Sequence, residues 1–275
     1  MKGLRFLRVL LASLTFVCAN LFFLGAAEWA AILFKVQLFP ALLALNIAAV
    51  AAVLVVTLVF GRVYCSVVCP MGVFQDAVIW LSRRVQRSVP PKKRTLPSPP
   101  RFLRYVSLGI CAALVALGFV SLGALLDGYS LYGRIAAQVF RPVYSVLHNL
   151  IAAFLSDHGH PVLFHEVVFV RGACALAVAV TGLVGVAAMA WWRGRLFCNS
   201  LCPVGAVLSL AAHRPLVRIR IDPAKCVKCG LCAASCKCGA IDVTQTRIVD
   251  SVCARCFDCA AACRKGAISS LNGSD

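Results

Sequence analysis

Eight cysteines near the C-terminus fall into two runs with the same spacing, C-x2-C-x2-C-x3-C. The runs are Cys226, Cys229, Cys232 and Cys236, and then Cys253, Cys256, Cys259 and Cys263. Three closely spaced thiolates can hold three corners of a [4Fe–4S] cubane, and the fourth can reach the other cluster in two-cluster proteins. A single run could bind zinc, whereas two intact runs in tandem favour two [4Fe–4S] clusters and one-electron chemistry.

The two runs form an internal repeat with a shift of 27 residues. The crossed ligand rule gives one cluster Cys226, Cys229, Cys232 and Cys263, and the other Cys253, Cys256, Cys259 and Cys236. Cys238 falls on Lys265 under this shift, so we expect its thiol to be a bystander. Lys237 and Arg264 stand where a proline usually follows the fourth cysteine. Basic side chains there would favour cluster reduction, because a reduced cluster is more negative.

A second repeat, which we call the C-P repeat, lies in residues 61–72 and 194–205. Both copies read G-R-apolar-aromatic-C-x3-C-P-x-G, and the proline should end or kink a local helix. Three interpretations are open for its cysteines: a further iron–sulfur centre or soft metal, redox-active thiols, or packing around a turn. The cysteines are Cys65, Cys69, Cys198 and Cys202.

The chain is 61% hydrophobic, well above the soluble average of about 45–50%. Four segments approach the roughly 20 apolar residues that a membrane helix needs. They are 7–27, 41–60, 104–126 and 172–192. We expect the stretch 127–171 between the third and fourth spans to lie along the outer membrane surface or to re-enter the membrane.

Basic residues set the expected orientation. Residues 62–104 contain nine Lys or Arg and one acid, whereas 127–171 contain three basic and three acidic residues. The positive-inside rule therefore places the basic, proline-rich loop 83–103, both termini and the C-terminal cysteines in the cytoplasm. The net charge of +18 follows from this asymmetry and favours anionic lipid, not nucleic acid, as a partner.

The expected fold is a mostly α membrane protein with four transmembrane helices in two pseudo-repeated pairs, followed by an α+β two-cluster ferredoxin domain. The membrane domain should comprise residues 1–215 and the ferredoxin domain residues 216–275. Alternation in Val217–Ile221 predicts a strand at the start of the second domain. The protein should be a multi-pass component of a bacterial inner membrane.

Paired C-x3-C-P motifs followed by two cysteine quartets resemble the NapH/MauN-type membrane ferredoxins. The similarity extends to Arg104-Tyr105-Val106 and Ser130-Leu131-Tyr132-Gly133-Arg134. Related membrane halves occur in NosR-type and CcoG-type proteins. The resemblance implies electron flow between the quinone pool and a partner redox enzyme, as a quinol dehydrogenase component. Other redox subunits, ferredoxin-like or cytochrome, are the implied partners.

Two alternatives use the same cysteines. One is a metal reductase acting on copper, as in CcoG-type relatives, and the other is a maturation factor that keeps a partner's thiols or metal reduced. Hydrolysis and group transfer have no candidate constellation, because the sequence offers no nucleophile–base set, phosphate loop or paired acids.

Overall fold

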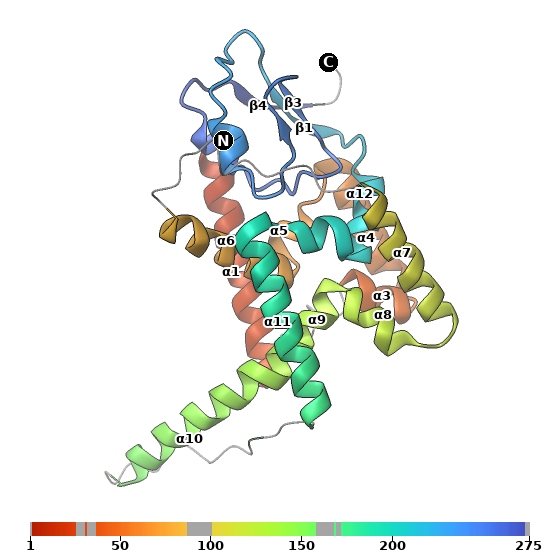
Figure 1. The fold of residues 1–275 in the computed structure, drawn as a ribbon, viewed down its shortest axis with the longest axis vertical. Coiled ribbons are helices and arrows are strands. Elements are labelled where there is room, and N and C mark those ends of the chain that lie inside the picture. Colours follow the sequence, from red (N-terminus) through yellow and green to blue (C-terminus); the bar gives the residue numbers. More distant parts are fainter. Residues whose placement is uncertain are drawn as a thin grey trace.

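A helical part and a small strand-containing part stack end to end in the computed structural model (Figure 1). The structure describes residues 2–25, 31, 37–86, 101–157, 168 and 172–272. Most of the predicted loop 83–103, including its prolines, lies outside the described residues. We refer to residues up to 215 as the helical part and to residues 216–272 as the C-terminal part.

The first half of the helical part runs from the N-terminus through the first C-P repeat. Its helices are α1 (Lys2–Leu24), α3 (Leu38–Leu43), α4 (Ile47–Phe60), α5 (Tyr64–Val67) and α6 (Pro70–Val85). The predicted span 41–60 is broken between α3 and α4. Leu45 has a positive φ of 52°, and the Asn46 side chain accepts a hydrogen bond from Ala49 N at 3.2 Å, which starts α4.

The second half contains a tight helical turn and a long helix. Its helices are α7 (Arg101–Ala116), α8 (Val120–Leu126), α9 (Gly128–Ile135), the π-helical turn η3 (Ala136–Phe140) and α10 (Arg141–Asp157). Gly118, with φ 85°, turns the chain back, so α8 packs against α7 and does not extend it. The predicted span 104–126 is therefore two short helices.

The second C-P repeat follows the last long helix. This region comprises α11 (Ala173–Arg193), the π-helical turn η4 (Phe197–Leu201) and α12 (Pro203–Ala211). Figure 1 shows α1 and α11 both running away from the C-terminal part, with α10 projecting furthest.

Three described helices are long and apolar enough to cross a membrane: Gly3–Leu24, Gly128–Ser156 and Ala173–Arg193. The first and third correspond to predicted spans. The second occupies the stretch expected to be interfacial, and the other two predicted spans contain shorter apolar helices, Ile47–Phe60 and Phe102–Ala116. These lengths and compositions indicate a multi-pass membrane protein, with its apolar helices divided differently from the four expected spans.

The C-terminal part consists of two small antiparallel sheets and two one-turn helices. Its elements are β1 (Val217–Ile221), α13 (Leu231–Ser235), β2 (Ile241–Asp242), β3 (Arg247–Ile248), α14 (Asp258–Ala262) and β4 (Ile268–Asn272). β1 pairs with β4, with Ile219 opposite Ser270, and β2 pairs with β3. The strand predicted for Val217–Ile221 is present.

A buried ion network joins the two parts around Asp76 of α6. Its carboxylate binds Arg195 Nε at 2.7 Å, Lys237 Nζ at 3.3 Å and the Arg8 guanidinium. Lys237 also binds Asp258 at 3.0 Å. Burial raises the pKa of Asp76, but the three cations outweigh burial and hold that pKa well below its usual range. One carboxylate thus ties α1, the second C-P repeat and the C-terminal part together.

We predict that Asp76→Asn destabilises the protein by about 3–5 kcal/mol, because removing one member of a buried ion network leaves the others uncompensated. Because the folded pKa is lowered, the wild-type contribution is present at neutral pH and is lost as the pH falls below about 4. Thermal unfolding of the purified protein measures both effects. Asp222→Asn, which removes an exposed carboxylate paired with Lys225, is the matched control and should change little. Equal unfolding temperatures for the two variants would contradict the role of the network.

Candidate iron–sulfur and thiolate sites

Two cavities in the C-terminal part are each lined by one cysteine set of the crossed rule. The outer cavity, about 240 Å³, is lined by Cys226, Cys229, Cys232 and Cys263. The inner cavity, about 10 Å³, is lined by Cys236, Cys253, Cys256 and Cys259. Cys238, the expected bystander, also lines the inner cavity. The fold thus brings each fourth cysteine to the triplet of the other run.

The two cysteine loops share one backbone conformation. Lys228 and Arg255 occupy equivalent positions and have left-handed φ values of 51° and 55°. Gly230 and Phe257, also equivalent, have φ values of 77° and 59°. These positive φ angles curl each triplet around its cavity.

The fourth cysteine of each run accepts a backbone hydrogen bond from the residue four positions later. Ala240 N donates to Cys236 Sγ at 3.4 Å, and Ala267 N donates to Cys263 Sγ at 3.3 Å. Amide donors to cysteine sulfur stabilise thiolate ligands and tune iron–sulfur potentials. The types and spacing of the donors therefore suit [4Fe–4S] ligation, one cluster to each cysteine set.

A single metal ion is a poorer fit to these thiols. Within the described ranges, no three Cys, His, Asp or Glu side chains converge as a ligand set for one ion. Thiols that line a cavity, and do not meet at a point, suit a cubane, whose four irons are each bound separately.

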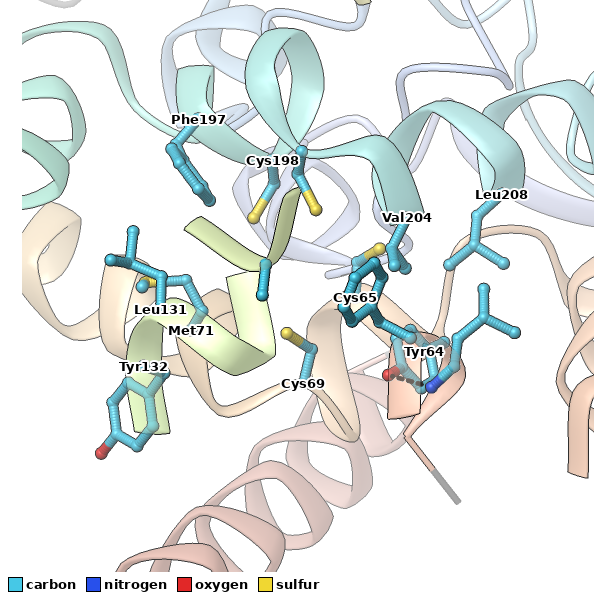
Figure 2. Packing of buried hydrophobic residues seen from close by; sticks show 14 of the residues in the cluster. Tyr64, Cys65, Cys69, Met71, Leu131, Tyr132, Phe197, Cys198, Val204 and Leu208 are labelled. Carbon is cyan, nitrogen blue, oxygen red and sulfur yellow. Dashed lines mark hydrogen bonds between the residues drawn. The ribbon is translucent and has the colours of Figure 1, made fainter. Parts of the chain in front are cut away.

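The four cysteines of the C-P repeats also come together, in the core of the helical part. Cys65 lies in α5 and Cys198 in η4, whereas Cys69 and Cys202 are the residues before the first proline of α6 and α12. All four are at most 8% exposed. Figure 2 shows Cys65, Cys69 and Cys198 close together, with the Cys69 and Cys198 sulfurs directed toward the space between the repeats. We call this group the four-thiol site.

Each C-P repeat donates a hydrogen bond from its arginine to a cysteine carbonyl of the other repeat, and we call this pair of contacts the arginine exchange. Arg62 of the first repeat donates to the Cys198 carbonyl at 3.0 Å, and Arg195 of the second donates to the Cys65 carbonyl at 2.9 Å. Both guanidinium groups are at most 2% exposed. This exchange gives the site an approximate twofold symmetry.

The motif glycines make room for that exchange. A Cβ atom on Gly72 would lie 2.0 Å from the Cys65 carbonyl oxygen, and one on Gly205 would lie 2.1 Å from the Cys198 carbonyl oxygen. Only glycine therefore allows each cysteine carbonyl to sit against the following helix and accept the arginine of the other repeat.

Polar donors surround the sulfurs of the four-thiol site. Gln75 Nε2 donates to Cys198 Sγ at 3.1 Å, and Gly205 N donates to Cys202 Sγ at 3.4 Å. Arg62 Nε and Arg195 Nη2 are buried and have no hydrogen-bond partner among the described residues. Such unused donors beside sulfur fit an anionic group held by thiolates.

Burial keeps three of the four thiols protonated when no such group is bound. Burial raises the pKa of Cys69 and Cys202 well above the usual thiol value, and it raises that of Cys198 to about 12. Neighbouring thiols reinforce the shift. At neutral pH these three thiols are therefore neutral, and a soft metal centre would deprotonate them on binding.

The segments that line the inner cavity are hydrogen-bonded to α6 and to the C-P repeats. Arg83 of α6 donates to the Ser235 and Cys236 carbonyls at 2.8 and 3.2 Å, and Arg195 N donates to Lys237 O at 2.9 Å. Arg62 donates to Ser251 O at 3.2 Å, two residues before Cys253. The segments leading to both runs of inner-cavity ligands are therefore held by the helical part.

Sequence reasoning missed the residues that build this junction. Lys237 was expected to favour cluster reduction, but its ammonium group is engaged by Asp76 and Asp258. The crossed roles of Arg62 and Arg195 were also missed. Their equivalent positions in the two repeats were the available signal, but a repeat does not reveal which carbonyl each side chain reaches.

Comparison with known proteins places the iron–sulfur signature on the helical part as well. A family model described as a 4Fe-4S binding domain matches residues 42–88 and 175–221, the two segments that contain the four-thiol site. The methylamine utilization ferredoxin-type protein MauN of Paracoccus denitrificans is 29% identical over 180 residues. The chain is therefore similar to the ferredoxins of the NapH/MauN type. The matches support [4Fe–4S] binding by this chain and an electron-transfer role for it.

The aligned regions are partial. The MauN match covers 65% of this chain and 49% of MauN. Two uncharacterized proteins of Methanocaldococcus jannaschii are 24% and 26% identical, over 69% and 66% of this chain and 64% and 54% of their own lengths. The chain thus spans about half to two thirds of the length of these relatives. No solved structure matches it.

We predict about 12 irons per fully loaded chain, four for each of three cubanes, and about 8 in Cys65→Ser/Cys198→Ser. Iron and protein assays on anaerobically reconstituted protein measure this ratio. Cys111→Ser, which removes a buried thiol outside the three cysteine sets, is the control and should leave the ratio unchanged. A ratio near 8 in the wild-type protein would eliminate a cubane at the four-thiol site.

Proposed function

We propose that the protein relays electrons between the quinone pool and a partner redox enzyme, with quinol oxidised in the helical part. The observation that carries this proposal is an apolar cavity of about 380 Å³ that opens beside the four-thiol site. A quinone needs such an apolar chamber for its ring and tail, next to a redox centre.

The cavity lies between α3, α7 and α12. Its lining is almost wholly apolar. Pro203 and Val204, which directly follow Cys202, form one wall, and Leu38 and Cys111 contribute to the others. A ring bound here would sit within a few side chains of Cys202, in surroundings that exclude water.

Two polar groups near the apolar cavity, Tyr64 and Asp127, are candidates to take up the protons that a quinol releases. The Tyr64 hydroxyl accepts from Leu38 N at 3.2 Å and donates to Gln37 Oε1 at 2.6 Å, and Leu38 lines the cavity. Asp127 is 1% exposed, and its charge contributes to the raised pKa of Cys202. Burial raises the pKa of Asp127 to about 6 although Ser130 hydrogen bonds oppose the shift, so this carboxylate can take up a proton near neutral pH.

The proposed ligand assignment follows the two cavities and the four-thiol site. Outer-cavity cysteines would hold one [4Fe–4S] cluster, inner-cavity cysteines a second, and the four-thiol site a third. When bound, these clusters supply one-electron carriers for the two electrons that a quinol releases with its two protons. The protein's own contribution is to hold the three cysteine sets in one fold, with the segments around the inner cavity fixed against the helical part.

The proposal places residues 216–275 as a ferredoxin domain on the cytoplasmic side of an inner membrane, where a ferredoxin-like or cytochrome subunit could exchange electrons with the outer cluster. Support comes from the positive-inside charge pattern and from the outer cysteines, since Cys229 is exposed whereas the inner Cys236, Cys256 and Cys259 are buried.

We predict that Ala112→Trp slows reduction of the clusters by a menaquinol analogue at least about tenfold, the factor that corresponds to 1.4 kcal/mol of lost binding. Ala112 is an exposed residue of α7 that lines the cavity, so an indole there would fill the chamber. Anaerobic bleaching of the iron–sulfur absorbance measures the rate. Ala113→Trp, one residue further and outside the cavity lining, is the matched control.

Dithionite should reduce both variants at the wild-type rate, which separates a quinol defect from cluster loss. Equal quinol rates in the two variants would rule out this cavity as the quinol site. A wild-type protein that dithionite reduces, that quinol does not reduce, and that copper ions rapidly reoxidise would favour the metal-reductase alternative.

A further inference from the structure

A polar cavity of about 610 Å³ lies where the helical and C-terminal parts meet, away from all twelve proposed ligand cysteines. Its wall comes from the start of α7, the end of α12 and the strands β1 and β3. Six basic side chains line it. They are Arg104, His213, Arg214, Arg218, Arg220 and Arg247.

The cavity carries a large excess of positive charge. Asp250 is the acidic residue of the lining, and its carboxylate is already bound to Arg255 Nη2 at 3.0 Å. Five guanidinium groups around one concave space repel one another, and an anion in that space would relieve the repulsion.

The fold holds these arginines in place. Arg218 and Arg220 share one face of β1 because they alternate with the buried Ile219 and Ile221, and both are only partly exposed. Arg104 is 2% exposed and is fixed by hydrogen bonds to Asn199 O at 2.9 Å and Ser209 Oγ at 2.7 Å. A site with fixed donors loses less entropy when it binds a ligand.

We propose that this cavity binds a phosphate-bearing anion. Guanidinium groups recognise phosphate oxygens through paired N–H donors, and several arginines converging on a polar concavity suit a compact, multiply charged group. The cavity also lies at the start of the apolar helix Phe102–Ala116, where a lipid phosphate would be within reach if that helix enters a membrane. The phosphate can therefore belong to an acidic phospholipid headgroup or to a soluble phosphate compound.

The cavity is linked to the inner-cavity loop. Ser251 lines it, and the Ser251 carbonyl accepts hydrogen bonds from Arg62 at 3.2 Å and Arg104 at 3.4 Å. Cys253 follows two residues later. A bound anion would therefore restrict the motion of the segment that leads into the second cysteine run.

The test compares Arg218→Gln/Arg220→Gln with Arg84→Gln/Arg193→Gln. The control pair removes the same charge from exposed positions outside the cavity. Iron content and unfolding temperature verify that both variants fold. Isothermal titration of the full chain in phosphatidylcholine nanodiscs with inorganic pyrophosphate probes a soluble phosphate. Native mass spectrometry of protein from nanodiscs containing phosphatidylglycerol probes a lipid phosphate.

The expected result is that one probe binds the wild type and the control pair alike and binds the cavity variant at least about tenfold more weakly, from the loss of two charge-assisted contacts. Loss of pyrophosphate binding assigns the site to a soluble phosphate compound. Loss of retained phosphatidylglycerol assigns it to lipid. If neither probe distinguishes the cavity variant from the control pair, or neither binds the wild type, the proposal is overturned.

Discussion

The reciprocal hydrogen bonds between Arg62 and the Cys198 carbonyl, and between Arg195 and the Cys65 carbonyl, are the constraint on which the rest of the structure depends. They join two segments that are more than a hundred residues apart in sequence. Each arginine must lose its water to enter the core, and only charge-assisted bonds to backbone oxygen and to Asn199 or Asp76 offset that cost. Once both arginine hydrogen bonds form, the four thiols are held next to one another.

The same two arginines also position the C-terminal part. Arg62 reaches Ser251 O, and Arg195 reaches Asp76, whose carboxylate in turn binds Lys237. The four-thiol site and the inner cavity are thus supported by shared side chains, and a change in one is transmitted to the other through rigid, buried contacts. Electron transfer benefits from such rigidity because the distance between redox centres stays fixed.

In the C-terminal part, cysteine spacing predicted the two crossed sets that line the outer and inner cavities, because in two-cluster ferredoxins with this spacing the fourth cysteine of each run belongs to the other cluster. The long spans α1 and α11 were likewise predictable from apolar length. The breaks at Leu45–Asn46 and Gly118 were not, since single residues interrupt stretches whose composition remains apolar. The Asp76 network could not be foreseen either, because its partners come from four separate segments and their pairing exists only in the fold.

The contacts between the inner-cavity segments and the helical part have a consequence for the order in which clusters are inserted. Arg83 and Arg195 bond to the backbone around Cys236, and Arg255, between Cys253 and Cys256, packs so closely on Gly61 that a Cβ there would lie 2.8 Å from its Nε. Cluster delivery by a carrier protein requires open access to the thiols, and in the joined structure the inner Cys236, Cys256 and Cys259 are buried. The outer site, with Cys229 exposed, remains accessible afterwards. Maturation would therefore proceed from the membrane outward, and repair of oxidative damage would be restricted to the outer cluster.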